Sequence, residues 1–377
     1  MMLRNIRICN FKAFKEAEIT LGNLNLFTGL NGMGKSSFIQ VLLLLRQEYL
    51  KNKGFDQELM LKGELISLGL GSDIYNTDSN SQQIFIELEW DNESLVECAI
   101  EYNPELANYD ILPASYKISS DDLEELSLFN FQFEYLNALR IIPAQTFPVS
   151  THHIQHENAL GINGEYSIHY LYENQREDIK IEALAHPGTK EAVGNLSLLN
   201  QVDLWMSYIS PGVKLTPDSM IDYEVSSIKY SFEGARTESK PFKSINVGFG
   251  ITYALPIVLA ILKAKPGDLV ILENPESHIH PRGQAYMGEL FAKASAAGVQ
   301  LIIETHSDHI LNGIRVAAKR KQINANDVGI FFFERDPGSD EHYTQITEPF
   351  LDQDGRISNW PKHFFDEWSR RLDDLIE

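Results

Sequence analysis

The residues best able to do chemistry follow an apolar stretch near the start of the chain and form the pattern Gly-x-x-x-x-Gly-Lys-Ser, from Gly29 to Ser36. Glycines let the backbone take positive φ and turn its N–H groups onto phosphate oxygens, which a Cβ would obstruct. Lys35 is expected to reach the β- and γ-phosphates of a nucleotide, and Ser36 to ligate Mg²⁺. The apolar run that follows predicts a helix whose positive dipole end faces the anion. The residues predicted to hold the nucleotide are Asn31, Gly32, Met33, Gly34, Lys35, Ser36 and Ser37.

A second set of candidates lies at the ends of two strand-like runs in the C-terminal half. The apolar run 269–272 ends at Glu273, a position from which a strand-tip carboxylate can hold the water shell of Mg²⁺. A buried strand with a capping acid is the alternative, but the Pro-Glu and His-Pro pairs that follow argue against it. The next run, 300–304, is followed by His306, which could hydrogen-bond a γ-phosphate.

The elements that position these groups alternate between helix and strand in the C-terminal half, which predicts an α/β core with a mainly parallel sheet. An N-terminal antiparallel hairpin leads into it, and residues 151–243 form a small α+β insertion, too short and too interrupted by Pro and Gly for a long coiled coil. Strands are predicted at 3–11, 14–21, 24–28, 84–90, 95–102, 135–143, 221–225, 228–232, 268–273, 300–304 and 328–335. Helices are predicted at 35–51, 195–210, 250–263, 284–297 and 308–321, with an acidic helix-like piece at 121–128.

The composition of the 377 residues, 43% of them hydrophobic, predicts a soluble globular protein of about two or three domain-sized units. No apolar run approaches the ~20 residues of a membrane span, and the start lacks the apolar core of a signal peptide, so we expect a cytoplasmic protein and no membrane partner. Cys9 and Cys98 lie in strand-like patterns and are expected to be buried, reduced thiols. The net charge of −21 argues against a basic coat for non-specific nucleic-acid binding, while a local basic groove stays compatible with it.

Four motifs together resemble the Walker A, Walker B, D-loop and switch-histidine motifs of ABC-type ATPases of the RecF/SMC/OLD kind, often labelled AAA-family ATPases in bacteria. The matching residues are 29–36, then Glu-Asn-Pro-Glu at 273–276, His-Ile-His-Pro at 278–281 and Glu-Thr-His-Ser at 304–307. The resemblance covers roughly residues 1–90 and 240–345, and the middle matches only loosely. It implies ATP and Mg²⁺ as ligands, with the nucleotide sandwiched between two heads of a homodimer or a higher even oligomer.

The resemblance also implies a signature segment that closes on the γ-phosphate held by the other head. The segment 246–256 matches by position, so Gly248 and Gly250 are the candidates to present backbone N–H groups across the dimer. It departs from the Leu-Ser-Gly-Gly-Gln form of transporters. The tail 354–366 resembles a C-terminal segment of a bacterial subgroup whose function is uncharacterised, and members of the wider group often sit in anti-phage defence operons.

The Walker B segment departs from the family in a way that bears on hydrolysis. Two adjacent acids are usual, whereas this chain has Glu273 followed by Asn274. An amide can orient water but cannot accept its proton. Glu276 is therefore the candidate general base, and His306 is expected to help position the water. Slow hydrolysis is predicted, and a clamp that binds ATP without hydrolysing it is the alternative.

Two further features receive structural interpretations. The run His-His-Ile-Gln-His at 152–156 is interpreted as a polar loop, because no Cys, Asp or Glu sits at zinc spacing from it. Arg140, predicted within a strand, could contact a phosphate or the insertion, or belong to a satisfied buried ion pair. Too few residues follow Arg335 for the Toprim nuclease domain that OLD-type proteins carry, so any nuclease activity would reside in a partner.

The function predicted from these observations is an ATPase that switches a separately encoded effector, such as a nuclease, in bacterial anti-phage defence. DNA is a candidate partner or trigger. The alternatives are a RecF-like DNA-binding repair ATPase and a nucleotide-gated scaffold. Every version requires Lys35, Glu273 and His306 to reach one nucleotide. The predicted divisions are an ATPase head in two parts, 1–145 and 244–345, an insertion at 146–243 and a C-terminal segment at 346–377.

Overall fold

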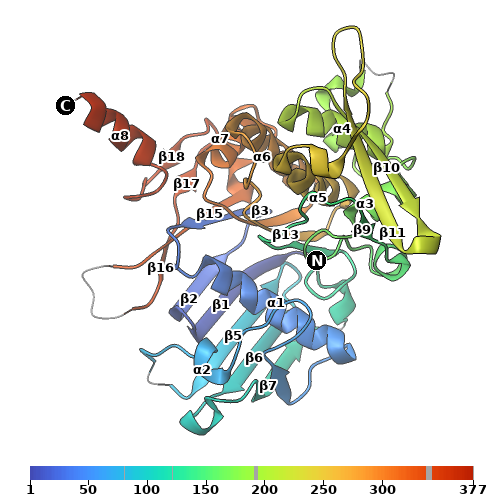
Figure 1. The fold of residues 1–377 in the computed structure, drawn as a ribbon. Coiled ribbons are helices and arrows are strands. Elements are labelled where there is room, and N and C mark those ends of the chain that lie inside the picture. Colours follow the sequence, from blue (N-terminus) through green and yellow to red (C-terminus); the bar gives the residue numbers. More distant parts are fainter. Residues whose placement is uncertain (80, 121, 191–193, 337–341, 377) are drawn as a thin grey trace. The chain divides into compact units, whose positions relative to one another are not determined.

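The computed structural model describes residues 1–79, 81–120, 122–190, 194–336 and 342–376. These residues form two compact units, each assembled from segments that are far apart in the sequence. The first unit comprises Met1–Asn130, Val328–Leu351 and Ile357–Glu377, and the second comprises Phe131–Asp327 and Asp352–Arg356. Figure 1 labels their helices and strands. This division does not test the predicted boundaries at 146, 244 and 346, which stay predictions.

The first unit contains a six-stranded antiparallel sheet in the order β2-β1-β5-β6-β7-β4 (Figure 1). Alternate residues are buried from Ile84 to Trp90 in β5 and from Val96 to Ile100 in β6, the pattern of a sheet with one covered face. The strands are β1 (Leu3–Phe11), β2 (Phe14–Thr20), β4 (Glu58–Met60), β5 (Gln83–Trp90), β6 (Leu95–Glu101) and β7 (Ile111–Ser119).

Helix α1 (Lys35–Asn52) runs across a face of this sheet (Figure 1). The ring of Phe129 lies 5.0 Å from Tyr49 of the helix and 5.8 Å from Trp90 of β5, and so links the two layers. The other short elements of the unit are α2 (Gly71–Ile74), β17 (Phe350–Leu351), β18 (Ile357–Ser358), α8 (Glu367–Ile376) and 3₁₀ turns at Pro104–Leu106 and Leu123–Glu125.

A second group of strands in the first unit supports the start of α1. The fully buried β3 (Leu24–Gly29) pairs in parallel with β15 (Val328–Glu334), which pairs antiparallel with β16 (Gln345–Thr347). Aromatic rings from β2, β3, α1 and β15 pack mostly edge to face, with centroids 5.3 to 6.2 Å apart. These rings belong to Phe14, Phe27, Phe38, Phe331 and Phe333. They fix the two elements that flank the glycine-rich loop.

The second unit contains a parallel group of strands in which β13 (Leu269–Glu273) lies between β8 (Phe133–Leu136) and β14 (Gln300–Glu304). Its long helices are α5 (Phe249–Lys263), α6 (Pro281–Ala296) and α7 (Asp308–Lys319). Helix α5 is buried along almost its whole length, as its apolar sequence requires. Helices α6 and α7 cross closely at Gly288 and Gly313, where a Cβ would collide with the backbone of the other helix.

The predicted insertion is a mixed α+β region within the second unit. Strands β10 (Val213–Met220) and β11 (Val225–Phe232) form an antiparallel hairpin, visible beside α4 in Figure 1, and β9 (Phe147–Pro148) and β12 (Phe242–Lys243) pair with β11. Its helices are α3 (Ser167–Asn174) and α4 (Leu198–Ile209). Short turns lie at His152–His156, Glu182–Leu184, Pro187–Lys190, Ile221–Tyr223, Ser244–Asn246 and, outside this region, Ala325–Asp327.

The predicted α/β fold with N-terminal antiparallel strands is confirmed, but three local predictions are wrong and one long strand is missing from the predictions. The strand predicted at 135–143 ends at Leu136, because the chain then loops so that Arg140 can reach backbone oxygens. Residues 221–223 form the hairpin turn rather than a strand, since Glu224 takes a left-handed φ of 52°. Strand β7 was not predicted. Asp121 lies outside the described residues, and the rest of the acidic piece holds only a 3₁₀ turn at Leu123–Glu125.

Candidate nucleotide-binding site

The glycine-rich loop of the first unit connects β3 to α1 and has the backbone that its sequence predicts. Gly29, Gly32 and Gly34 have φ angles of 140°, 77° and 89°, in the left-handed half of φ space that side chains disfavour. A Cβ at Gly29 would collide with the carbonyl of Phe333, and one at Gly34 would lie 3.1 Å from the ring of Phe14. The loop therefore depends on glycine at both ends.

Lys35 sits at the start of α1 and folds back over this loop. Its Nζ donates hydrogen bonds to the carbonyls of Gly29 (3.0 Å) and Leu30 (2.9 Å), and its side chain is buried. The first turn of α1 carries no acidic residue, so the positive end of the helix dipole is not offset there. Asn31, Gly32 and Ser36 are exposed. This combination of cation, exposed loop backbone and helix N-terminus suits an anion such as a nucleotide phosphate.

Glu273 ends β13 in the second unit and is held by its neighbours. Its Oε1 accepts a hydrogen bond from the hydroxyl of Tyr135 on β8 at 3.0 Å. Burial raises the pKa of Glu273, while the bonds from Tyr135 and the Ala138 backbone and the charge of Arg140 oppose the shift. A half-buried carboxylate at a strand end has the oxygen chemistry that Mg²⁺ prefers.

Arg140 supports the backbone that follows Glu273. Its guanidinium donates to the carbonyl of Glu273 through both NH groups at 2.8 Å and to the carbonyl of Asn274 at 2.6 Å, and it lies 4.5 Å from the ring centroid of Tyr253. Burial lowers the pKa of Arg140 to about 10, so the group stays cationic at neutral pH. Of the alternatives considered for Arg140, a buried ion pair is not seen among the described residues: its two NH groups donate to backbone oxygens, and its buried Nε makes no hydrogen bond there.

Glu276 connects the loop after β13 to the loop after β14. Its two carboxylate oxygens accept hydrogen bonds from the Thr305 hydroxyl (2.8 Å) and from the backbone N–H of His306 (2.7 Å). His306 is exposed, and Ser307 caps α7 through the N–H of Ile310 (3.1 Å). Glu276 and His306 are thus brought together as the sequence predicts, by a contact that fixes the position of the histidine loop.

Asn274 has an unusual conformation in the same loop. Its φ is 44°, and its backbone N–H donates to the carbonyl of Glu304 at 2.8 Å. Its side-chain Oδ1 is buried and makes no hydrogen bond to another described residue. An unsatisfied buried carbonyl oxygen is costly, so this atom is suited to accept a hydrogen bond from a water or a ligand.

The two glycines predicted to belong to a signature segment lie at the N-terminus of α5. Gly248 is its N-cap residue, and Gly250 lies where a Cβ would collide with the carbonyl of His278. The ring of His278 lies 5.5 Å from Phe249 and 5.2 Å from Tyr253, so the segment predicted as the D-loop packs against α5 of its own chain. Phe249 is 49% exposed and is available for contact.

The predicted site residues fall into two groups according to unit. The glycine-rich loop, Lys35 and Ser36 belong to the first unit, whereas Glu273, Glu276, His306 and the α5 N-terminus belong to the second. In the second unit Glu276 contacts the loop of His306, and Gly250 lies against His278. The requirement that one nucleotide reaches both groups stays a prediction.

Sequence reasoning missed the roles of Tyr135 and Arg140. Tyr135 meets Glu273 across 138 positions of sequence, and no local pattern announces such a contact. A buried arginine just after a short apolar run was the available signal. The carbonyl groups that Arg140 binds depend on the path of the loop after β8, and this path cannot be predicted from the sequence.

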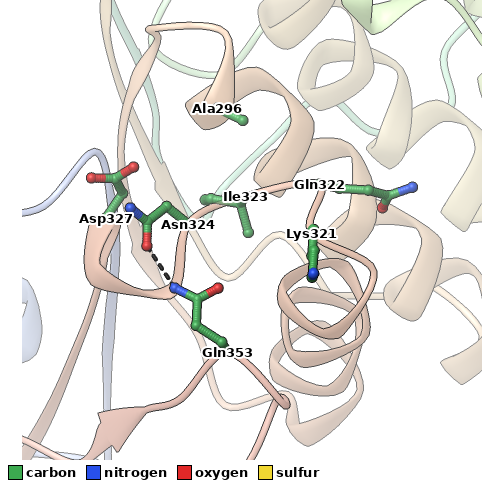
Figure 2. Close-up of a pocket in the computed structure, with 7 residues that line it drawn as sticks. All are labelled: Ala296, Lys321, Gln322, Ile323, Asn324, Asp327 and Gln353. Atoms are coloured by element: carbon green, nitrogen blue, oxygen red, sulfur yellow. Dashed lines mark hydrogen bonds between the residues drawn. The ribbon is translucent and has the colours of Figure 1, made fainter.

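A separate pocket of about 490 Å³ lies in the second unit (Figure 2). Gln353 closes one side of it by donating a hydrogen bond to Asn324 at 2.7 Å. Its lining residues are Ala296, Lys321, Gln322, Ile323, Asn324, Asp327 and Gln353. It contains none of the predicted site residues.

Across the described residues, no helix combines the length and apolar character needed to span a membrane.

The glycine loop, the parallel strand group and the helix N-terminus define an ABC-type ATPase head. Comparison with known families agrees. The chain belongs to the AAA-domain family described as "AAA domain, putative AbiEii toxin, Type IV TA system", whose model matches residues 24–312. Residues 323–375 match a second family, "Protein of unknown function (DUF3696)". A comparison with curated proteins found no match.

Solved structures with a similar fold include two SMC head domains. One is a head domain with an extended coiled coil, bound to the C-terminal domain of ScpA, from Pyrococcus furiosus; it has a TM-score of 0.53 and 10% identity and covers 100% of both chains. The other is an SMC head bound to the C-winged helix domain of ScpA; it has a TM-score of 0.51 and 11% identity and covers 94% of this chain and 99% of that chain. At this identity the likeness establishes the fold alone.

Proposed function

We propose that this protein binds ATP with Mg²⁺, hydrolyses it slowly and dimerises head to head around the nucleotide to switch a partner protein. The observation that carries the proposal is the buried Lys35, folded over a loop of left-handed glycines at a helix N-terminus that lacks acids. Loops of this kind bind phosphate through backbone N–H groups and a lysine charge.

Each predicted residue has a role that follows from its position. Lys35 and the N–H groups from Asn31 to Ser37 bind phosphates, while Ser36 and Glu273 hold Mg²⁺ and its water shell. Tyr135 and Arg140 position Glu273. Mg²⁺ supplies charge neutralisation at the bridging phosphate oxygens when it is bound. Gly248 and Gly250 of one head close on the nucleotide of the other.

The water that attacks the γ-phosphate is assigned to Glu276, Asn274 and His306. Each carboxylate oxygen of Glu276 already accepts one hydrogen bond from the protein, which leaves fewer lone pairs open to a water, and Asn274 can only orient water. Both features support slow turnover. The unsatisfied Oδ1 of Asn274 is the atom that we assign to hold this water.

The partner is proposed from the comparisons. The family description names a toxin of a type IV toxin–antitoxin system, and two similar SMC heads are solved with ScpA domains bound to them. We propose that this chain likewise engages a separately encoded protein, an effector such as a nuclease in bacterial anti-phage defence. A RecF-like repair role would instead require DNA binding, which the net charge of −21 disfavours outside a local groove.

The test measures ATP binding and phosphate release by wild type and by the variants Lys35→Ala, Glu273→Gln and Glu276→Gln. Wild type should bind ATP and release phosphate slowly, Lys35→Ala should lose binding, and the two carboxylate variants should bind but lose turnover. Glu101→Gln, an exposed carboxylate of β6, is the matched control and should behave as wild type. Binding without any turnover in wild type would favour the scaffold, and absence of binding would overturn the proposal.

A further inference from the structure

We propose that His152, His153 and Glu157 form a binding site for a divalent transition-metal ion of the zinc class. These residues lie in the second unit, between β9 and α3, and take no part in the nucleotide chemistry proposed above. One ligand atom from each residue lies within 4.8 Å of the other two. The sequence interpretation as a loop without an acidic partner is wrong in this respect, because Glu157 supplies the carboxylate.

The backbone conformation explains why the side chains of His152, His153 and Glu157 lie close together. Residues His152–His156 form a π-helical turn, closed by the N–H of Glu157 donating to the carbonyl of His152 at 3.3 Å. The extra residue in such a turn brings position i+5 near position i, and position i+4 also lies close to it. Both imidazoles therefore face the same carboxylate. The wider turn, rather than the spacing in an ordinary helix, creates the cluster.

The distances suit an ion between the side chains better than direct hydrogen bonds. His152 Nδ1 lies 3.6 Å from Oε1 of Glu157, and His153 Nε2 lies 3.6 Å from Oε2. Both separations exceed a normal N–H···O bond. Two ligands on one tetrahedral Zn²⁺, with bonds of about 2.0–2.2 Å, lie roughly 3.3–3.5 Å apart. The two 3.6 Å distances reach different oxygens of Glu157, and the three ligand atoms, one from each residue, lie within 4.8 Å of one another, so they must move closer to bind one ion. Small rotations of these exposed or half-exposed side chains would complete the geometry.

Neighbouring groups orient one of the imidazoles for this role. The Nδ1 of His153 is hydrogen-bonded to the Ser150 hydroxyl at 2.8 Å, and its ring stacks on Tyr166 with centroids 4.5 Å apart. When Nδ1–H donates to Ser150, the lone pair is on Nε2, the nitrogen that faces Glu157. A hydrogen bond from the far ring nitrogen is the usual support of a metal-binding histidine.

The donor set defines the ion. Two imidazoles and one carboxylate suit Zn²⁺ and similar borderline ions, and leave one position for water. The ring of His156 lies 5.6 Å from that of His152. Ser150 also donates its N–H to the buried His169 of α3 at 3.3 Å. Bound metal would therefore brace the segment that connects β9 to α3.

The experiment titrates Zn²⁺ into tag-free, chelator-treated full-length protein by calorimetry, without nucleotide and in excess Mg²⁺. We expect one equivalent per chain and a rise in the melting temperature. His153→Asn and Glu157→Gln should abolish both effects, and Ser150→Ala should weaken binding by about tenfold or more. His363→Asn, an exposed histidine of the first unit, is the matched control and should bind as wild type does.

Circular dichroism of the metal-free variants separates lost ligands from lost folding. Native spectra with lost Zn²⁺ binding in His153→Asn and Glu157→Gln support the site. Should either variant misfold, Co²⁺ absorption of the wild type decides, since tetrahedral nitrogen and oxygen ligands give a visible d–d band. No such band, or unchanged Zn²⁺ affinity in the folded Glu157→Gln variant, would overturn the proposal.

Discussion

At the scale of single residues, the most informative side chain is Arg140, because it holds the backbone on which Glu273 depends. It donates to three carbonyls, those of Asn137, Glu273 and Asn274, and no described acid pairs with it in an ion pair. An arginine whose two NH groups bind several carbonyls fixes a loop by geometry, which a lysine with its single nitrogen cannot reproduce. The position of the backbone at Glu273 is therefore determined from outside its own strand.

Replacing Arg140 should accordingly impair the site and the second unit together. We expect Arg140→Lys to lower the free energy of unfolding by about 2–4 kcal/mol, since buried carbonyls lose their donors. Denaturant unfolding measures this change. Mg²⁺-dependent ATP binding should weaken at the same time. Arg236→Lys, at an exposed position of the second unit, serves as the control. An Arg140→Lys protein of unchanged stability would contradict the role assigned to its forked hydrogen bonds.

His186 makes the stability of the second unit depend on pH. Burial lowers its pKa to about 4 from the ordinary 6.5, and the charge of Lys293 contributes. As pH falls through this window the unfolded chain binds a proton that the folded chain does not, so the free energy of unfolding decreases. His186→Asn keeps an acceptor for the N–H of Gly188, which donates to Nδ1 at 3.0 Å.

The prediction concerns the difference between wild type and His186→Asn. Asp203 and Asp268, whose pKa values are raised to about 6 by burial, act in the opposite sense but are common to both proteins. Between pH 6.5 and pH 4 the free energy of unfolding of the wild type should fall by about 1–3 kcal/mol more than that of the variant. Chemical denaturation measures both values. If the free energies of unfolding of wild type and His186→Asn differ by the same amount at pH 6.5 and at pH 4, His186 does not titrate as proposed.

The sequence predicted the residue-scale chemistry where it is local. The glycines, Lys35 and Ser36 are contiguous, and their geometry follows from their own backbone requirements. The sequence predicts that Glu276 and His306 act on the same water, but it does not predict the hydrogen bonds that Glu276 accepts from Thr305 and from the backbone of His306. The metal cluster at residues 152–157 was not found, because its spacing fits a π-helical turn and zinc patterns assume ordinary helices or loops.

At the scale of elements, a buried ion pair joins α5 to β8. Lys263 Nζ lies 2.7 Å from Glu134, with side-chain exposures of 6% and 4%, and it also donates to the carbonyl of Asn158. Glu134 in turn accepts from the N–H of Leu160. The pair is thus fully surrounded by partners, and breaking one side leaves the other charge without compensation.

We expect Glu134→Leu and Lys263→Met each to destabilise the second unit by about 3–5 kcal/mol. The double variant Glu134→Leu/Lys263→Met should recover part of this loss, since no isolated charge stays buried. Thermal and denaturant unfolding of the set provide the measurement, with Lys180→Met, which forms an exposed pair with Glu177, as control. Additive losses in the double variant would rule out direct coupling.

Element prediction succeeded wherever the hydrophobic period was regular. The strands at 3–11 and 300–304 and the helix from residue 308 begin where their patterns begin. Element prediction failed at 221–225, where the alternating pattern continues through a hairpin turn. It also failed at 135–143, where several apolar residues lie in a loop; Leu139 and Ile142 are exposed at 79% and 61%. Tertiary contacts decide both cases.

At the scale of the whole molecule, the residues predicted to bind the nucleotide are distributed over two units. The phosphate loop belongs to one unit, and Glu273 and His306 belong to the other. A ligand that touches both groups must stabilise both units at once, because binding energy is shared by every group that contacts the ligand. The prediction that one triphosphate reaches Lys35, Glu273 and His306 therefore implies that ATP stabilises both units.

Amide hydrogen exchange can test it. ATP with Mg²⁺ should slow exchange both in the loop at 29–37 and in the segments after β13 and β14. Lys35→Ala should remove both effects, while Lys15→Ala, outside the loop, should remove neither. Protection confined to the first unit would contradict the prediction that Glu273 and His306 share the nucleotide.

The interleaving of the two units also has a consequence for biosynthesis. The buried strand β3 is made early, whereas β15, its parallel partner, is made about three hundred residues later, and residues 131–327 of the second unit emerge in between. Until β15 appears, β3 has an open, apolar edge of the kind that promotes misassembly. A nascent chain stalled before residue 328 should therefore require a chaperone on the ribosome, which full-length chains would release once β15 is in place.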